Sequence, residues 1–343
     1  MRDGLALPSA FPLGGSAPAA HLEPIRLPRD ELAHEFPVEW WYFAGHVGEI
    51  HGTERLSFMV TAIRGTKWVV PPLTVSFVKR IDHARGPLQL LQSGGAFAVA
   101  YEGHDTPVSY RLGYAANIYN LWVASPDRWR IDGQPGHYRL RLWNAASQPE
   151  LDLELTATAP AVLLSEDGIV DYGAGHRLAY YVRPKIHVTG YARFGGRLRV
   201  VTGPGWYERQ WGSAPTTVYA WKYLNVSLDD GEQWIFFHTK LATVERHYAA
   251  RMPAAGGIEE LPLRPADFRN VDVVGRPLGT DLRVDMPDGP MQLSVRPLYG
   301  AEPDIESIYP FVPGFWESAC LVEGQRNGTP VRGWSMTELR GYG

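Results

Sequence analysis

The sequence has little of what metal-, nucleotide- or thiol-dependent enzymes use. A single cysteine, Cys320, among 343 residues excludes an internal disulfide and a Cys-x-x-Cys metal site. The chain contains no G-x-S-x-G elbow, P-loop, G-x-G-x-x-G fingerprint or H-E-x-x-H pair. Its 11 histidines are scattered, and we expect ordinary roles for His46, His51, His176 and His187 rather than a metal site. We therefore expect no cofactor and no metal, with the chemistry carried by side chains alone.

Runs of charged or apolar residues are also missing. Lys and Arg form no run, and the formal net charge of −4 argues against a surface for nucleic acid or anionic membranes. No window approaches about 18 apolar residues, so we expect no transmembrane helix. Pro, Gly and Ser interrupt residues 1–30, unlike the apolar segment of a signal peptide. We expect a loose arm over these residues and a cytoplasmic location. We also expect an apolar small molecule as the partner, and the sequence predicts no oligomeric state.

Aromatic residues and signs of β structure are abundant. The 12 tryptophans and the 12% aromatic content exceed ordinary usage, so the rings fill a core or line an apolar site. The stretch "HYRLRLWN" alternates and places Tyr138, Leu140 and Leu142 on one face of a strand. Asp-Gly pairs at 230–231 and 288–289 are typical of hairpin turns. Together with 36 Gly and 28 Pro, this pattern predicts an all-β sandwich or barrel.

The length of the chain predicts two domains rather than one core. The loop "GSAPTT" at 212–217 separates two strand-rich halves and is the best candidate for their boundary. We therefore expect an N-terminal domain over 31–217 and a C-terminal domain over 218–343. Interfaces between domains are favoured places for ligand sites, which directs attention to the residues just before this loop.

The stretch "GWYERQWG" at 205–212 brings a carboxylate among large aromatic rings. In an extended strand, residues two apart point to the same side. One face carries Trp206, Glu208 and Gln210, and the other carries Tyr207, Arg209 and Trp211. Arg209 therefore cannot neutralise Glu208 within the strand.

Three further acids lie on apolar faces by the same alternation, namely Glu39, Glu317 and Glu338. For any one of them, the structural interpretation is a buried carboxylate paired with an arginine or with backbone N–H groups. The functional interpretation is a carboxyl group kept protonated, because burial costs the charged form more than the neutral form. Protonation at pH 7 needs a pKa rise of about 3 units, or about 4 kcal/mol. Glu208 has the densest aromatic surroundings and lies near the expected boundary, so it is the first candidate.

Several motifs, which run in family order from about residue 30 to 343, carry a resemblance to known proteins. They are "EWWYFAGHV", "ATAPAVLLSEDG", "YYVRPKIHVTG", "GPGWYERQWG", "AWKYLNVSLDDGEQWIFF" and "FWESACLVEG" with "RGWSMTELRGYG". The chain resembles the AttH-like and carotenoid 1,2-hydratase (hydroxyneurosporene synthase) family. This resemblance implies two consecutive lipocalin-like antiparallel β-barrels. It also implies one of several activities: hydration of an isoprenoid double bond, hydration of a phytoalexin, or Diels–Alder cyclisation of a polyketide. In the hydratase pattern the position of Glu208 is more often an aspartate, so this chain keeps the acid but lengthens it.

We predict a cofactor-independent enzyme that acts on an apolar polyene, terpenoid or polyketide and protonates or activates a C=C bond for hydration or cyclisation. The alternatives are a Diels–Alderase-type pericyclase, which orients and hydrogen-bonds its substrate, and a non-catalytic binder of an apolar small molecule. The predicted catalytic residues are Glu208, Lys222 and Tyr207. The predicted substrate-binding residues are Trp41, Trp206, Gln210, Trp211, Trp221, Tyr223, Tyr181, Glu39, Trp316 and Glu338.

Overall fold

The computed structural model describes most of the chain. The described residues are 22–34, 36–65, 73–84, 93–95, 97–102, 109–114, 128–144, 146–173, 175–213, 218–241, 244–299 and 316–341.

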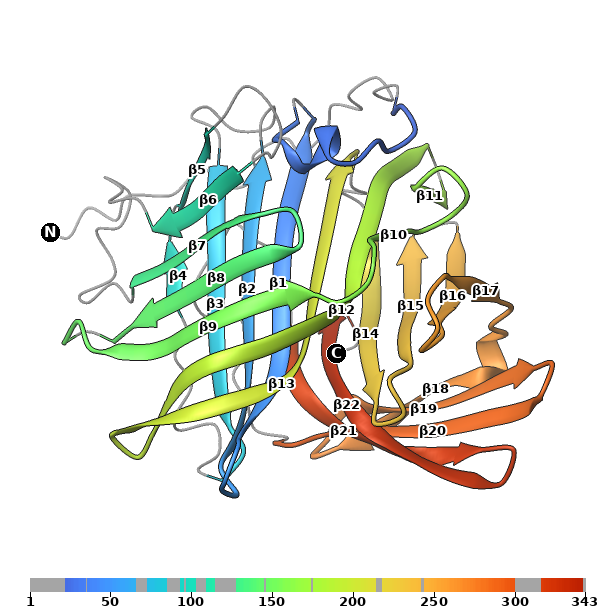
Figure 1. The fold of residues 1–343 in the computed structure, drawn as a ribbon. Coiled ribbons are helices and arrows are strands. Elements are labelled where there is room, and N and C mark those ends of the chain that lie inside the picture. Colours follow the sequence, from blue (N-terminus) through green and yellow to red (C-terminus); the bar gives the residue numbers. More distant parts are fainter. Residues whose placement is uncertain are drawn as a thin grey trace, which may run out of the picture.

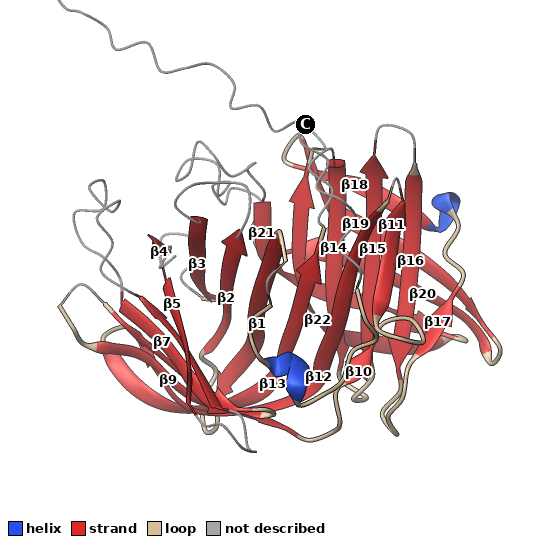
Figure 2. Ribbon diagram, turned by 90° about the horizontal axis from the view of Figure 1, so that it is seen from above, coloured by secondary structure: helices blue, strands red, loops and turns tan. Residues whose placement is uncertain are grey.

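Two curled antiparallel sheets form half-barrels that lie side by side (Figures 1 and 2), which confirms the expected all-β, lipocalin-like fold. The first sheet has the order β4-β3-β2-β1-β13-β12-β9-β8-β7-β6-β5, with β10 and β11 paired to β12. The second has the order β17-β16-β15-β14-β22-β21-β20-β19-β18. Both follow a nearly sequential strand order, as expected of chains built from hairpins.

The strands have the following bounds. The first sheet consists of β1 (Val38–Glu49), β2 (Arg55–Gly65), β3 (Leu73–Asp82), β4 (Ser93–Gly95), β5 (Phe97–Glu102), β6 (Ser109–Tyr114), β7 (Arg128–Gln134), β8 (His137–Trp143), β9 (Pro149–Ala157), β10 (Val162–Leu163), β11 (Ile169–Gly173), β12 (His176–Phe194) and β13 (Arg197–Gly212). The second consists of β14 (Val218–Leu228), β15 (Gln233–Leu241), β16 (Glu245–Met252), β17 (Glu259–Leu261), β18 (Phe268–Val273), β19 (Arg276–Met286), β20 (Gly289–Pro297), β21 (Trp316–Arg326) and β22 (Thr329–Arg340). The described residues also form two short 3-10 helices, η1 (Arg29–Glu31) and η3 (Pro265–Asp267).

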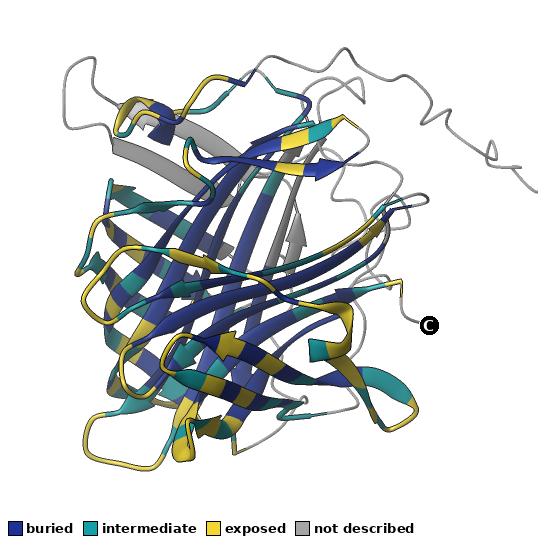
Figure 3. Cartoon of the chain, turned by 90° about the vertical axis from the view of Figure 1, so that its right-hand side faces the viewer, coloured by how far each residue is buried: buried dark blue, intermediate teal, exposed yellow. Residues whose placement is uncertain are grey.

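The alternation in the sequence becomes an alternation of burial. In β8, Tyr138, Leu140 and Leu142 are buried while their neighbours face outward, as the sequence predicts. Exposed residues gather at hairpins and sheet edges (Figure 3). In contrast, β1, β13 and β15 hold continuous buried runs, because both of their faces are covered.

Three apolar layers result from this arrangement. The inner layer of the first sheet contains residues such as Trp41 and Tyr207. The inner layer of the second sheet contains residues such as Leu224 and Trp316. Between the sheets lies a third cluster, the inter-sheet layer, to which both sheets contribute; Trp206 comes from the first and Phe237 from the second. The candidate site lies in this shared layer.

The expected domain boundary falls at a change of sheet. β13 ends at Gly212 in the first sheet and β14 begins at Val218 in the second, while residues 214–217 lie outside the described residues. The boundary itself stays a prediction. Residues 1–21 of the expected arm also lie outside the described part.

Residues 22–30 differ from the expected loose arm. Leu22 and Ile25 are buried in the inner layer of the first sheet. These two apolar side chains anchor this part of the segment on the sheet. In the described part of the chain, no helix is long and apolar enough to cross a membrane.

Candidate active site

Strand pairing brings acids and tyrosines of both sheets into the inter-sheet layer. In the first sheet, Tyr42 of β1 lies directly opposite Glu208 of β13. In the second, Glu338 of β22 lies between Tyr223 of β14 and Glu317 of β21. Directly opposed residues of antiparallel strands point to the same face, so each sheet presents a row that carries tyrosine and glutamate.

The two rows exchange hydrogen bonds across the layer. The Tyr42 hydroxyl donates to Oε1 of Glu317 at 2.6 Å, from the first sheet to the second. The Tyr223 hydroxyl donates to Oε2 of Glu208, from the second sheet to the first. Each sheet therefore supplies the donor for an acid of the other, and the site is complete only when the two sheets are packed together.

Glu208 is buried and receives several hydrogen bonds, most of them on one oxygen. Its Oε2 accepts the Tyr180 hydroxyl at 2.9 Å, the Trp206 indole N–H at 3.1 Å and the Tyr223 hydroxyl. Its Oε1 is contacted by the Gln210 amide at the longer distance of 3.4 Å. The two oxygens therefore differ: Oε2 is held as an acceptor and Oε1 is the freer position for a proton.

Glu317 and Glu338 have fewer partners. Oε2 of Glu317 is buried and has no hydrogen-bond partner among the described residues, although Oε1 accepts from Tyr42. Glu338 Oε1 accepts the indole N–H of Trp221. A buried carboxylate oxygen without a donor is costly in its charged form, which favours a protonated carboxyl group.

The environment raises the pKa of all three acids. Burial raises the pKa of Glu208, although its hydrogen bonds act in the opposite direction. Burial, followed by the negative charges of Glu338 and Glu208, raises the pKa of Glu317 well above its usual range. Burial and the charge of Glu208 raise the pKa of Glu338 to about 7. Like charges in one apolar layer oppose simultaneous ionisation, so the three carboxyl groups hold protons more tightly together than each would alone in water.

Two cations border the cluster and partly counteract the rise in the pKa values of Glu317 and Glu338. The Lys79 ammonium donates to the backbone carbonyl of Glu317, and its charge lowers the pKa of that acid. The Arg340 guanidinium lies 4.9 Å from the ring centre of Trp221 and lowers the pKa of Glu338. Burial and carboxyl repulsion outweigh both cations, because the resulting pKa shifts are upward.

The structure brings only part of the predicted site together. Trp206, Glu208 and Gln210 share one face of β13, and Trp221, Tyr223 and Glu338 face them from the second sheet. The inner layer of the first sheet instead holds Trp41, Tyr181, Tyr207, Trp211 and Glu39, away from Glu208. The inner layer of the second sheet holds Trp316 and Lys222. The reason is alternation: a neighbour by one residue in a strand points to the opposite side.

Glu39 is a paired structural carboxylate rather than part of the cluster. Its carboxylate forms an ion pair with Arg209 and accepts from His34 Nδ1 at 2.9 Å. Burial alone would raise the pKa of Glu39, but the charges of Arg209 and His34 lower it below its ordinary value. Trp41 and Trp211 complete this unit: Arg209 lies 4.6 Å from the Trp41 ring centre, and His34 stacks on Trp211.

Lys222 is anchored on the far side of β14 from Tyr223. Its ammonium donates to Oδ1 of Asn270 at 3.0 Å and to the carbonyls of Pro277 at 2.9 Å and Gly279 at 2.7 Å. Burial lowers the pKa of Lys222 to about 7. These contacts fix three chain segments of the second sheet and direct the amine away from Glu208.

Sequence reasoning missed several members of the cluster. Tyr42, Tyr172 and Tyr180 were not predicted, and Glu317 was recognised only as an acid on an apolar face. Tyr180 adjoins the predicted Tyr181, so the error is one position in the "YY" pair. The signal that would have found them is strand pairing, since Tyr42 is opposite Glu208 in β1.

A surface groove of about 450 Å³ borders the same inter-sheet layer, although the described residues that line it do not include the three acids. Val162 of β10, Met252 of β16 and Ile258 line it, and these residues also pack in the inter-sheet cluster. Its other lining residues include Ala161, Pro184 and Lys185. The groove is mostly apolar in its residues and lies between strands of both sheets.

The two half-barrels define a lipocalin-like protein, and the acidic cluster between them is its candidate site. A model of the AttH-like family matches residues 18–342, and the chain belongs to this family. A comparison with curated proteins found no match.

Solved structures are similar in fold. A protein described as an AttH from Nitrosomonas europaea is 24% identical, with a TM-score of 0.68 over 95% of this chain and 99% of that chain. Kievitone hydratase from Nectria haematococca is 15% identical, with a TM-score of 0.60 over 88% of each chain. CghA, solved with Sch210972, is 12% identical, with a TM-score of 0.57 over 89% of this chain and 88% of that chain. At these identities the similarity shows the fold alone.

Proposed function

We propose that this protein is a cofactor-independent enzyme that protonates a C=C bond of an apolar polyene, terpenoid or polyketide for hydration or cyclisation. The observation that carries the proposal is the cluster of Glu208, Glu317 and Glu338, buried together with raised pKa values. Perturbed acids in an apolar layer are typical of functional sites. A hydratase among the proteins of similar fold supports the same class of reaction.

Glu208 is the proposed proton donor. Oε2 is held by three donors, so the proton belongs on Oε1, the oxygen with the longer amide contact. Ionised Glu317 or Glu338 would raise the pKa of Glu208 further, because their charges act on one another through the same layer. Tyr180 and Tyr223 hold the carboxyl group through Oε2, and in this proposal Oε1 is the oxygen presented to the alkene.

The reaction would proceed through a carbocation. The alkene π electrons take the proton from Oε1, a C–H bond forms, and Glu208 becomes a carboxylate. In hydration, water adds to the cation and returns a proton to Glu208, so that alkene and water give an alcohol. In cyclisation, an internal hydroxyl attacks and gives its O–H proton to Glu208, or an internal alkene attacks and the new cation loses a C–H proton from a neighbouring carbon to Glu208. In this proposal the rings of Trp206 and Trp221, whose indole N–H groups donate to Glu208 and Glu338, stabilise the positive charge.

The groove of about 450 Å³ is the proposed entry for the substrate. It offers apolar side chains and borders the inter-sheet layer, which matches an apolar chain rather than a charged metabolite. Trp41, Trp211, Tyr207 and Lys222 have no place in this proposal, because they face other layers.

The test is a panel of terpenoid and polyene substrates incubated with the purified protein and analysed by mass spectrometry. A gain of one water marks hydration, and an unchanged mass with a new retention time marks cyclisation. Glu208→Gln is expected to lower turnover by at least about 100-fold, the usual contribution of a general acid. Glu323→Gln, an exposed change on β21, is the matched control and should leave turnover unchanged.

Two outcomes would contradict the proposal. Near-normal turnover of Glu208→Gln would point to a pericyclase that works by orientation and hydrogen bonding. Recovery of every compound unaltered, with tight retention of one of them, would identify a binding protein.

A further inference from the structure

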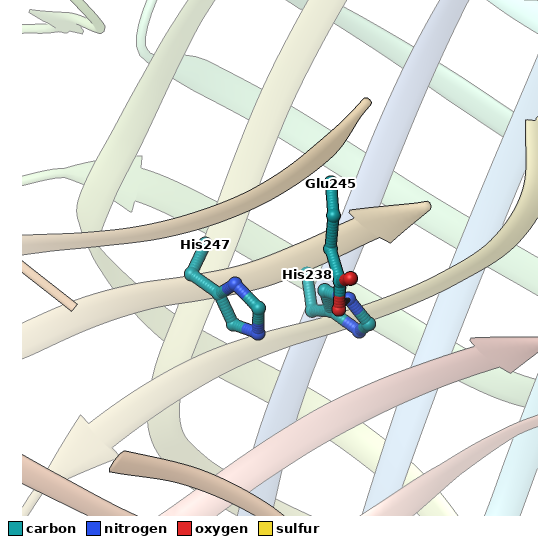
Figure 4. A group of neighbouring side chains, drawn as sticks. All are labelled: His238, Glu245 and His247. Atoms are coloured by element: carbon teal, nitrogen blue, oxygen red, sulfur yellow. Dashed lines mark hydrogen bonds and ion pairs between the residues drawn. The ribbon is translucent and has the colours of Figure 1, made fainter. Parts of the chain in front are cut away.

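A cluster of metal-ligating side chains lies outside the acidic site. His238 of β15 pairs directly with His247 of β16, and Glu245 is two residues before His247 (Figure 4). One donor atom from each of the three residues lies within 4.8 Å of the other two. In the part of the chain that the structure describes, this is the one group of three such side chains within reach of a single ion.

We propose that His238, Glu245 and His247 form a site for a divalent transition metal, and that Zn²⁺ fits these donors best. Two imidazole nitrogens and one carboxylate oxygen are a common zinc ligand set that leaves a position open for water or a further ligand. Soft or borderline ions favour imidazole, whereas Mg²⁺ and Ca²⁺ favour oxygen donors alone. The donor set therefore predicts zinc over magnesium.

The three donor atoms are near enough to be gathered around one ion, although the rings are not yet turned toward it. Tetrahedral zinc with bonds of about 2.1 Å places its donor atoms about 3.4 Å apart. His238 Nε2 and Glu245 Oε1 are 2.8 Å apart and share a hydrogen bond that the metal would replace. The two imidazole rings stack with their centres 4.3 Å apart and an interplanar angle of 16°. All three side chains project from the same side of the strands (Figure 4). An imidazole binds a metal in the plane of its ring, so the stacked rings have to turn for both nitrogens to face one ion.

The surroundings hold one ligand firmly and leave another free to adjust. His238 is buried, His247 is partly buried, and the Glu245 side chain is 49% exposed. The Phe268 ring packs beside both imidazoles, with centres 5.9 Å from each. An apolar neighbour on one side and solvent on the other give an ion a route of entry.

The site is separate from the acidic cluster. Ile235 and Phe237 of β15 pack in the inter-sheet layer, so His238 faces the other side. Lys222 lies directly opposite His238 in the sheet, but its ammonium is held by Asn270 and two backbone carbonyls. The carboxylate of Glu245 supplies the negative charge that offsets this neighbour.

The test is a calorimetric titration of the untagged, chelator-treated full chain with Zn²⁺. We expect one Zn²⁺ per chain, no comparable binding of Mg²⁺, and a tetrahedral Co²⁺ absorption spectrum when Co²⁺ is added instead. Glu245→Gln and His247→Ala should each weaken Zn²⁺ binding by at least about 100-fold, more than loss of an outer-shell contact usually does. His137→Ala, which removes an exposed histidine of β8, is the control and should bind like the wild type.

Absence of Zn²⁺ binding by the wild type would overturn the proposal. So would equal affinity in the wild type and in Glu245→Gln, a variant of an exposed side chain that keeps the fold. A rise of the melting temperature with Zn²⁺ in the wild type, absent from Glu245→Gln, would support it by a second measurement. None of these readouts depends on the reaction proposed for Glu208.

Discussion

At Glu39, a guanidinium and an imidazole contact the carboxylate, whereas at Glu208 the neighbours are hydroxyls, an indole N–H and an amide. Both acids are buried, but Glu39 has an arginine as a charged partner, whereas Glu208 has only uncharged hydrogen-bond donors among the described residues. Their pKa values therefore move in opposite directions, downward for Glu39 and upward for Glu208. Because both acids are buried, the charge of their partners accounts for the opposite directions of the two pKa shifts.

This difference predicts different effects on stability. Glu39→Gln leaves the buried Arg209 without its carboxylate and should lower the free energy of unfolding by about 3 kcal/mol. Glu208→Gln keeps a hydrogen-bonding group of the same shape and should change it by less than about 1 kcal/mol. Urea unfolding at pH 7 measures both. Equal losses in the two variants would mean that Glu208 is held as a charged structural acid.

Glu338 predicts a dependence of stability on pH. In the folded protein its pKa is raised from 4.5 to about 7, so between these values the folded chain holds more protons than the unfolded chain. The contribution of Glu338 is complete below pH 4.5 and is lost as pH rises through about 7. The loss is on the order of 3 kcal/mol.

Chemical unfolding of the wild type and of Glu338→Gln across this pH range checks the prediction. The difference in free energy of unfolding between the wild type and Glu338→Gln should change with pH. Glu323→Gln, which alters an exposed acid, should follow the wild type. Parallel curves for Glu338→Gln and the wild type would show that Glu338 is charged throughout.

At the scale of the element, the sequence predicts which residues share a strand face but not which strands meet. The faces of "GWYERQWG" are as the alternation predicts, and so are the buried positions of β8. Alternation places Trp211 on the face opposite Glu208, but it cannot place Trp41 relative to Glu208, because that depends on the pairing of β1 with β13. That pairing joins segments more than 150 residues apart, and no local pattern encodes it.

The pairing of β1 with β13 gives a prediction of its own. A Cβ on Gly203 would lie 2.0 Å from the carbonyl oxygen of His46, a backbone atom that cannot turn away. Gly203→Ala should therefore push β1 from β13 and lower the free energy of unfolding by about 2 kcal/mol.

Thr202→Ala, at the adjacent position of the same strand, is the control and should lower the free energy of unfolding by less than Gly203→Ala does. Thermal or urea unfolding measures both variants. If Gly203→Ala is as stable as the wild type, the two strands can move apart locally without a loss of stability. The register beside the site would then be loosely set.

At the scale of the whole molecule, the two half-barrels share one apolar layer. Both sheets contribute to the inter-sheet layer, and hydrogen bonds such as Tyr42 to Glu317 cross it. The all-β class could be predicted from turn pairs and alternation, and the two-barrel arrangement from the family resemblance. The acidic cluster could not, since its members come from both sheets and converge only through their packing.

Because that layer is shared, we predict that the chain unfolds in one cooperative transition rather than two. Differential scanning calorimetry should give a calorimetric enthalpy equal to the van't Hoff enthalpy, and tyrosine and tryptophan probes should report the same midpoint. Two resolved transitions would show that each half-barrel is stable without the other and that the inter-sheet layer contributes little.

The central claim is that packing of the sheets keeps a carboxyl group of the cluster protonated at neutral pH, with Glu208 as the proton donor. Infrared spectroscopy of the purified protein at pH 7 detects the C=O band of protonated carboxyl groups directly. We predict such a band in the wild type and in the control Glu323→Gln, with a clear loss of intensity in Glu208→Gln. Absence of the band from the wild type, or equal intensity in Glu208→Gln, would contradict this account.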